Sequence, residues 1–290
     1  MGLRRRIKEW KKKKRGKETV QLQVGNYKLF ANGLHPIQDY LTVFKYYSRN
    51  LPRIAKYIEV KYPNYAIVDV GANIGDTIAL LRSVDVNQQV YLIEGEPSYF
   101  QLLQRNLVQF TKAKSIETFL GEENTVQEGA IESNEGTARV NPNAGKQITI
   151  KKLDDVAVEN NFDTVKLLKV DTDGFDFKIL RGAFDLIRKD KPVLFFEYDA
   201  VYLKEQNEHG TQTLTDLHGL GYSKAIYYDN YGKMLISTTL DNQQQLEQLH
   251  TYMGNRDAAF PYYDVCLFHA DDDALADEVI AKEMAFYKPQ

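Results

Sequence analysis

The sequence contains one cysteine, Cys266, among its 290 residues, and it lacks any apolar run near the roughly 18 residues that span a bilayer. A single cysteine excludes an intrachain disulfide and a zinc cluster built from several cysteines. The sequence also has no internal repeat and no low-complexity segment beyond a basic stretch at its start. With 43% hydrophobic and 27% charged residues, it has the composition of a globular protein and not of a disordered chain.

The net charge of −3 combines a short basic arm with an acidic body. Residues 1–17 carry ten lysines and arginines and one acid, Glu9, whereas the other residues include 27 basic and 39 acidic side chains. No apolar core of about 7–15 residues follows the basic stretch, which argues against a secretory signal and favours a cytoplasmic protein. The arm is either a solvated tail or a contact with an anionic membrane surface, such as the inner face of the membrane. A nucleic-acid partner is disfavoured because the acidic body would repel a polyanion.

Short β-rich segments alternate with helical periodicity from residue 66 onward. The run 66–70 precedes a helical stretch at 76–82, and the run 90–93 precedes another at 99–110. Further strands are expected at residues 115–120, 165–170, 193–196, 222–227, 233–237 and 263–268, with single helices at 176–189 and 211–220. This alternation predicts an α/β fold made of βαβ units around a parallel sheet.

The same pattern divides the chain into parts. We expect the basic arm at 1–17, an N-terminal helical cap at 18–62, a main domain at 63–270 and a C-terminal helix at 271–290. Residues 121–150 interrupt the alternation because they are polar and rich in glycine, asparagine and glutamate. An inserted loop or hairpin is therefore expected within the main domain.

A glycine-containing loop at residues 69–75 is the most informative stretch, because it leaves a buried strand and enters a helix. A dinucleotide fingerprint is excluded because Asn73 stands two positions after Gly71, and a P-loop is excluded because no lysine follows Gly75. Glu94 ends the next strand, where a carboxylate can accept both hydroxyls of a ribose. The pattern favours a nucleoside without phosphates, and S-adenosylmethionine fits that description. The alternative is that the glycines only make a tight turn.

Three blocks of sequence carry a resemblance to a known family. They are residues 68–77, residues 92–97 with Leu102, Leu103 and Asn106, and residues 168–176 with 180–183. Residues 191–192, 196–197 and 220–222 extend the match. The chain resembles the FkbM family of class I S-adenosylmethionine-dependent methyltransferases over about residues 63–230. It departs from the family at Gly95, where proline is usual, and at Asp173 and Asp176, where glutamate is usual.

The resemblance implies a Rossmann-like methyltransferase fold, which is a doubly wound, mostly parallel seven-stranded sheet with helices on both faces. It also implies S-adenosylmethionine as the cofactor. The expected cofactor-binding residues are Asp69, Gly71, Ala72, Asn73, Gly75, Asp76, Thr77, Glu94, Glu122 and Asp171. For Glu122, which follows the third strand, an exposed loop is the alternative. Lys169 is expected to pair with an acid.

Methyl transfer to an alcohol needs a proton acceptor, because the pKa of a hydroxyl is too high for unaided attack. Strand ends in a doubly wound sheet point at one crevice, so Asp171 and Glu197 are expected to converge on the reacting group. His209, in the loop after Glu197, is a further candidate base, with a surface histidine as the alternative. Asp173 could instead belong to a turn and helix cap. Asp171 and Glu197 could hold a divalent metal, but no Asp-Asn pair follows the later strand, so no metal is predicted.

The expected function is O-methylation of a hydroxyl on a sugar, glycan or secondary metabolite, with the substrate class resting on the resemblance alone. One alternative is a non-catalytic cofactor-binding protein associated with glycan machinery. A nucleic-acid methyltransferase is less favoured, because only the arm supports it. The sequence lacks both an Asn-Pro-Pro-Tyr-type motif and the catalytic Pro-Cys expected for base methylation.

Overall fold

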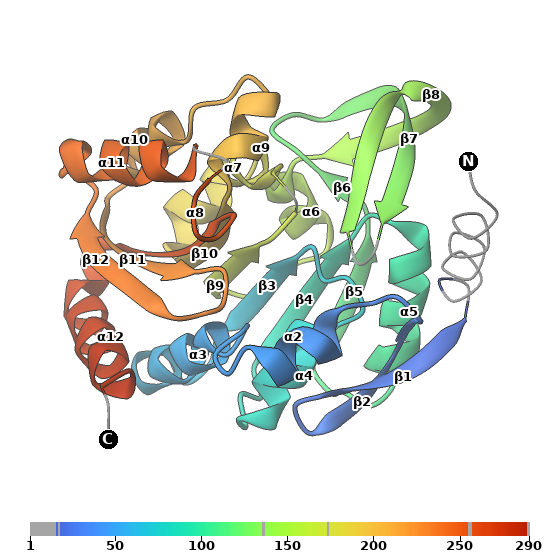
Figure 1. Ribbon diagram of the computed structural model, residues 1–290, viewed down its shortest axis with the longest axis horizontal. Helices are drawn as coiled ribbons and strands as arrows, with labels where there is room; N and C mark the ends of the chain where they lie inside the picture. Colours follow the sequence, from blue (N-terminus) through green and yellow to red (C-terminus); the bar gives the residue numbers. More distant parts are fainter. Residues whose placement is uncertain (1–15, 17, 135–136, 173, 255–256, 289–290) are drawn as a thin grey trace.

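The computed structural model describes residues 16, 18–134, 137–172, 174–254 and 257–288. The predicted basic arm at 1–17 lies outside the described residues, apart from Gly16. A central sheet is covered by helices on both faces, and a separate hairpin rises beside its edge (Figure 1). In the described part of the chain, no helix combines the length and apolar character that a membrane span requires.

The central sheet has the order β12-β11-β13-β10-β9-β3-β4-β5. Its parallel part consists of β5 (Ala113–Glu117), β4 (Gln89–Glu94), β3 (Ala66–Val70), β9 (Val165–Val170) and β10 (Val193–Tyr198). Antiparallel pairings then add β13 (Tyr263–His269), β11 (Tyr222–Asp229) and β12 (Met234–Thr239). The predicted mostly parallel α/β sheet is confirmed, but it has eight strands and not seven, because the chain turns back at Gly232 and adds β12 at the edge.

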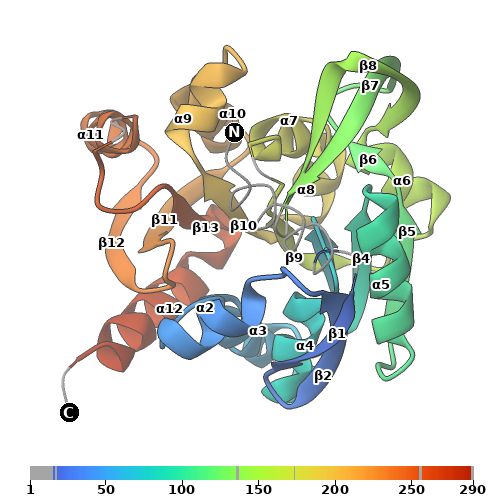
Figure 2. The same ribbon diagram turned by 45° about the vertical axis from the view of Figure 1, so that its right-hand side comes forward.

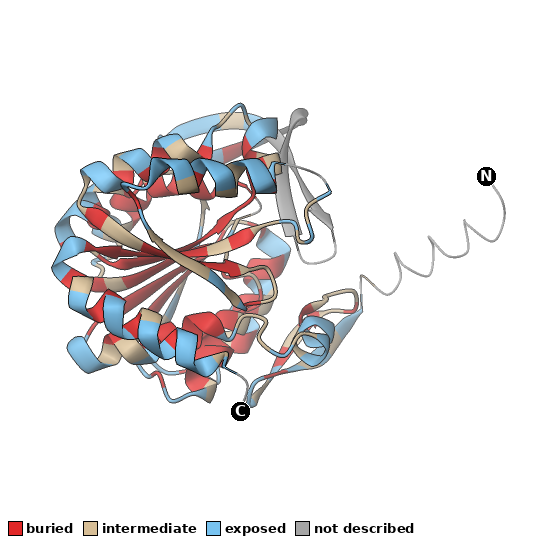
Figure 3. Cartoon of the chain, turned by 60° about the vertical axis from the view of Figure 1, so that its left-hand side comes forward, coloured by how far each residue is buried: buried red, intermediate tan, exposed pale blue. Residues whose placement is uncertain are grey.

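Successive side chains along the strands point to opposite faces of the sheet and pack into two separate hydrophobic cores, one on each face (Figure 3). In β3, Ile67 belongs to one core and Val68 to the other, and Cys266 in β13 is buried in the first. The first core packs against α3 (Asn50–Lys61), α4 (Asp76–Ser83), α5 (Pro97–Leu107) and α12 (Asp273–Phe286). The second packs against α6 (Leu153–Glu159), α7 (Asp176–Arg181), α8 (Phe184–Asp190), α9 (Ala200–Glu205), α10 (Gly210–Gly219) and α11 (Gln243–Met253). The strands are therefore apolar on both faces, as parallel strands between helix layers require.

The N-terminal segment is not purely helical, which corrects the prediction of a helical cap at 18–62. It begins with an antiparallel hairpin of β1 (Thr19–Val24) and β2 (Tyr27–Asn32), followed by α2 (Ile37–Val43) and α3. Gly25 makes the hairpin turn with a φ of 55°, a conformation that glycine adopts without strain. Val24 and Leu29 are fully buried, so this hairpin forms because its inner face packs into the first core. We call residues 18–49 the N-terminal cap from here on.

The structure shows which form two further segments take, the insertion expected at 121–150 and the helix expected at 176–189. Residues 121–150 contain most of a long hairpin, β7 (Thr125–Asn134) and β8 (Thr137–Lys151), which pairs with β6 (Phe119–Leu120) as a second sheet (Figure 1).

The single helix predicted at 176–189 is divided into α7 and α8. The division falls at Gly182, where an added Cβ would lie 2.1 Å from the carbonyl oxygen of Gly121. Glycine is needed there because two chain segments touch through their backbones. The C-terminal α12 follows a short 3-10 helix, Ala270–Asp272.

Candidate functional site

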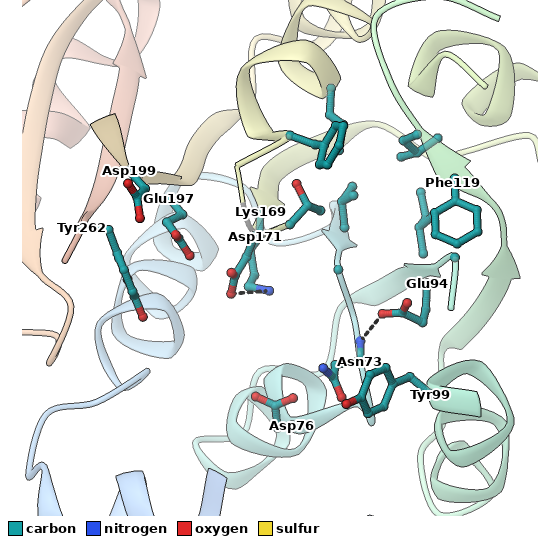
Figure 4. Close-up of a pocket in the computed structure, with 18 of the residues that line it drawn as sticks. Asn73, Asp76, Glu94, Tyr99, Phe119, Lys169, Asp171, Glu197, Asp199 and Tyr262 are labelled. Carbon is teal, nitrogen blue, oxygen red and sulfur yellow. Dashed lines mark hydrogen bonds and ion pairs between the residues drawn. The ribbon is translucent and has the colours of Figure 1, made fainter. Parts of the chain in front are cut away.

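A cavity of about 380 Å³ opens at the carboxyl ends of β3, β4, β9 and β10. Its volume lies within the range usual for small-molecule sites, about 300–1,000 Å³. One end of the cavity holds Glu94 and Phe119, the centre holds Asp171 with Lys169, and the far end holds Glu197 and Tyr262 (Figure 4). The sheet provides the floor, while the N-terminal cap, the second sheet and the loop before β13 provide the walls.

The glycine loop comes unusually close to the backbone that follows β9. Gly71 has a φ of 75°, and an added Cβ there would lie 1.9 Å from the carbonyl oxygen of Asp171. The N–H groups of Gly71 and Ala72 both donate to the carbonyl oxygen of Ile93, at 3.0 and 3.1 Å. The loop after β3 is thereby held against the neighbouring strand ends on both sides, and only glycine at position 71 permits this approach.

Glu94 is buried at the end of β4 and faces the cavity beside Asn73 (Figure 4). The Asn73 N–H donates to its Oε2 and the Glu96 N–H donates to its Oε1, each at 2.8 Å. Burial outweighs these hydrogen bonds and raises the pKa of Glu94 to about 7. Each carboxylate oxygen still has a lone pair to offer, so the group can accept two hydroxyls of a ribose.

Gly95 stands where the family usually has proline, and its lack of a side chain lets the ring of Phe119 form the cavity wall next to Glu94. A Cβ at position 95 would lie 2.4 Å from the ring of Phe119, so the backbone rests directly on that ring. Leu120 and Ile150 of the second sheet line the same end of the cavity. This gives an apolar slot beside a hydroxyl-accepting carboxylate, which is the combination that an adenosine needs. The chain therefore fits a nucleoside at this end.

A buried lysine organises the acids at the centre of the cavity. Lys169 Nζ lies 2.9 Å from Asp69 Oδ1 and 3.3 Å from Asp171 Oδ2, which confirms the predicted pairing with an acid. Burial alone would lower the pKa of Lys169, but the charges of Asp69, Asp171 and Asp76 outweigh it and raise that pKa. Lys169 is therefore a permanent cation. It neutralises the fully buried Asp69, while about half of the Asp171 side chain (52%) stays exposed.

The structure brings most of the predicted residues together. The cavity lining includes Gly71, Asn73, Asp76, Glu94, Asp171 and Glu197. Asp69, Ala72, Gly75 and Thr77 are buried and do not line this cavity, although Thr77 lines a smaller one beside it. Asp173 lies outside the described residues. Among the described residues, no group of three or more histidine, cysteine, aspartate or glutamate side chains is arranged to hold a metal.

Two predicted residues lie away from the cavity. His209 precedes α10, with its Nδ1 2.7 Å from Thr211 Oγ1 and its ring 4.1 Å from the ring of His250. The segment after Glu197 is not a loop, because it forms α9, which carries His209 away. Glu122 is turned outward where the chain leaves the sheet, and it pairs with Arg181 at 2.8 Å. Neither residue is part of the described lining, so both assignments are corrected.

Sequence reasoning missed the walls that come from distant segments. His35, Tyr40 and Tyr47 of the N-terminal cap, Tyr99 and Phe119 beside the nucleoside end, and Tyr262 before β13 all line the cavity. The signal that the sequence offers is the aromatic density of residues 27–62. Six tyrosines and two phenylalanines lie in that stretch, but periodicity does not show which of them face a ligand.

A second, smaller cavity of about 70 Å³ lies next to Asp171 and is lined by Asn50, Asp76 and Asp264 among others. The Asn50 amide donates to Asp264 Oδ2 at 3.2 Å. Burial and the charge of Asp171 raise the pKa of Asp264 to about 7. The protein therefore holds an acid here that takes up a proton near neutral pH.

Replacing Asp264 with asparagine should stabilise the cofactor-free protein more at pH 8 than at pH 5. The raised pKa of Asp264 means that its contribution to stability is complete below the unfolded pKa, near 3.8, and is lost as the pH rises through about 7. An asparagine avoids this loss, so the advantage of the variant should grow by about 3 kcal/mol between pH 5 and pH 8. Urea unfolding at both pH values measures it, and a constant difference would contradict the assignment.

A family model described as the methyltransferase FkbM domain matches residues 69–224, which is more than half of the chain. No curated protein matches.

Among solved structures, the chain is similar to the methyltransferase FkbM from Methylobacillus flagellatus KT, with 20% identity and a TM-score of 0.40. That match covers 56% of this chain and 40% of the other, so the chain spans less than two thirds of that protein's length. It is also similar to a precorrin-6y C5,15-methyltransferase from Geobacter metallireducens GS-15, with 14% identity, a TM-score of 0.37, and coverage of 71% and 81%. A third is the Pyrococcus abyssi tRNA (uracil-54, C5)-methyltransferase in complex with S-adenosyl-L-homocysteine, with 10% identity, a TM-score of 0.42, and coverage of 88% and 45%.

Proposed function

The chain belongs to the FkbM family of S-adenosylmethionine-dependent methyltransferases, and we propose that it methylates a hydroxyl oxygen of a sugar, glycan or secondary metabolite. The observation that carries the proposal is the position of two acids, Asp171 and Glu197, in one cavity with the nucleoside end at Glu94. Asp171 follows β9 and Glu197 lies near the end of the parallel neighbour β10, each directly after the last residue pair between these two strands, Val170 and Phe196.

The cofactor would lie along the floor of the cavity. Glu94 would accept the ribose hydroxyls, and Phe119 with the backbone at Gly95 would cover the adenine. Asp171 and Asp76 line the centre, where their negative charges favour the cationic part of the molecule. When bound, the cofactor supplies a methyl group on a positively charged sulfonium. The chain contributes the groups that orient this methyl group toward the acceptor.

The acceptor would occupy the far end of the cavity, where Glu197, Asp199 and Tyr262 lie across Asp171 from Glu94 (Figure 4). A hydroxyl bound there meets a buried carboxylate at Glu197, which can take its proton as the oxygen is methylated. Tyr262 offers a flat apolar side and a hydroxyl, a combination suited to polar ring compounds. Glu197 is therefore the proposed base, and Asp171 is proposed to orient the reacting groups.

Replacing Glu197 with glutamine should lower kcat by a factor of about 10²–10⁴ while leaving the affinity for S-adenosylhomocysteine within threefold. The amide keeps the shape of the side chain but cannot take up the proton. Turnover is measured as S-adenosylhomocysteine released with a panel of monosaccharides, glycans and hydroxylated metabolites. Glu205→Gln is the matched control, because Glu205 is exposed at the end of α9 and outside the lining.

Three outcomes of this experiment decide between the hypotheses. Full turnover in Glu197→Gln would exclude Glu197 as the base. Tight cofactor binding by the wild-type protein with no turnover on any acceptor would favour the non-catalytic alternative. Release of S-adenosylhomocysteine without a methylated hydroxyl in the product would exclude O-methylation while keeping the family assignment.

A further inference from the structure

The N-terminal cap touches the glycine loop directly, although it precedes that loop by some forty residues. Asn106, fully buried on α5, lies at the centre of one contact. Its Oδ1 accepts the Phe30 N–H at 2.7 Å, and its Nδ2 donates to the carbonyl oxygens of Phe30 and Ile74, each at 2.9 Å. One side chain thus ties β2 of the cap to the loop that follows β3.

A histidine of the cap makes the second contact, inside the cavity. His35 Nε2 lies 3.1 Å from Asn73 Oδ1, while His35 Nδ1 accepts the Ile37 N–H at 3.3 Å. Because Nδ1 accepts, the neutral ring carries its proton on Nε2 and donates it to Asn73. Burial lowers the pKa of His35, which favours this neutral form. The ring also stands edge-on to Tyr99, with the two centroids 6.3 Å apart.

Asn73 links this histidine to the carboxylate at the nucleoside end. Its φ of 47° lies in the left-handed region, where asparagine is tolerated better than most residues but still needs support. Its side chain accepts from His35, and its backbone N–H donates to Glu94 Oε2 at 2.8 Å. Whatever holds the side chain of Asn73 therefore also orients the peptide group that holds Glu94 (Figure 4).

We propose that His35 is a positioning residue for the cofactor, which acts by holding Asn73 and, through the Asn73 backbone, the Glu94 carboxylate in the arrangement that accepts the ribose. The N-terminal cap is then part of the cofactor site and not only a cover for the core. The proposal rests on the proposed binding of the cofactor ribose by Glu94, and it does not depend on which acceptor is methylated.

Two substitutions of His35 separate its two hydrogen bonds. Glutamine places an amide nitrogen near the position of Nε2 and keeps the contact with Asn73. Asparagine places an oxygen near the position of Nδ1, so it keeps the contact with Ile37 and loses the one with Asn73. In calorimetry with S-adenosylhomocysteine, His35→Gln should bind within threefold of the wild-type protein, whereas His35→Asn should bind about tenfold more weakly.

A double-mutant cycle tests whether the effect passes through Asn73. Asn73→Gly removes the side chain but keeps the left-handed backbone accessible. In that background, His35→Asn should cause no further loss of S-adenosylhomocysteine affinity. His218→Asn, on the exposed face of α10, is the control and should bind like the wild-type protein.

Several results would overturn the proposal. If His35→Gln and His35→Asn bind S-adenosylhomocysteine with equal affinity, whether normal or reduced, the hydrogen bond between His35 and Asn73 does not determine cofactor binding. A full tenfold loss from His35→Asn in the Asn73→Gly background would place the effect elsewhere. The melting temperature of each variant is measured without ligand as a control. If His35→Gln and His35→Asn are both partly unfolded and both bind more weakly for that reason, this result also counts against the proposal.

Discussion

Replacing Glu94 with alanine should weaken the binding of S-adenosylhomocysteine by about a hundredfold, or roughly 3 kcal/mol. The carboxylate is buried at the nucleoside end and accepts the N–H groups of Asn73 and Glu96. Hydrogen bonds to a charged group contribute about 1.5–3 kcal/mol each, and the two ribose hydroxyls would form such bonds. The substitution removes these bonds and also leaves two backbone donors without their acceptor, so the glycine loop loses its orientation.

The pH dependence of binding provides a second measurement on the same residue. Since the pKa of Glu94 is raised to about 7, the carboxylate is mostly protonated at pH 6 and mostly ionised at pH 8. The ionised form is the better hydrogen-bond acceptor for the ribose hydroxyls, so the wild-type affinity for S-adenosylhomocysteine should rise about tenfold from pH 6 to pH 8. This rise should be much smaller in Glu94→Ala.

The matched control is Glu122→Ala. Glu122 was predicted to bind the cofactor, but its side chain is about half exposed (46%) and pairs with Arg181 outside the cavity. Its removal should leave S-adenosylhomocysteine affinity within twofold. Calorimetry with S-adenosylhomocysteine compares the wild-type protein, Glu94→Ala and Glu122→Ala. Normal affinity in Glu94→Ala would exclude Glu94 as the residue that accepts the ribose hydroxyls.

Replacing Gly71 with alanine should lower the free energy of unfolding by about 3 kcal/mol or more and abolish cofactor binding. A φ of 75° alone costs a residue with a Cβ about 1–2 kcal/mol. The new Cβ would also lie 1.9 Å from the carbonyl oxygen of Asp171, an atom of the backbone that cannot rotate away. The loops after β3 and β9 must therefore separate, and both of them line the cavity.

Gly219→Ala is the comparison for this substitution. Gly219 is the last residue of α10, and nothing lies within 4 Å of the position of its Cβ. Alanine there should be neutral or stabilise the helix by a few tenths of a kcal/mol, up to about 1 kcal/mol. Urea unfolding compares the two variants, and equal stability would contradict the close approach at Gly71.

Local sequence patterns predicted the central elements well because their cause is local. The run Val165–Val170 was predicted as a strand and forms β9 with the same bounds. The loop at residues 69–75 was predicted from its glycines, and the φ angles of Gly71 and Gly75 explain why glycine stands there. The hairpin of β1 and β2 was missed, since only the packed core shows which face of its strands is buried.

The candidate site could be predicted only in part, for a related reason. Asp171 and Glu197 lie at the carboxyl ends of two parallel strands of one sheet, so the fold class alone brings them together. His209 was misplaced because the segment before it folds as α9, a short helix with weak periodicity. Tyr47, Tyr262 and His35 could not be predicted, since each comes from a connection whose path depends on what it packs against.

The sequence by itself determined the alternation of strands and helices, the glycine loop, the acid that ends β4 and the family to which the chain belongs. Each of these depends on neighbouring residues, so spacing and residue type suffice to encode it. Only the tertiary structure decided that Lys169 pairs with Asp69, that Asn50 reaches Asp264 across 214 positions, and that His35 holds Asn73. Such contacts arise when separate segments are packed against one sheet, and no local pattern specifies which of them meet.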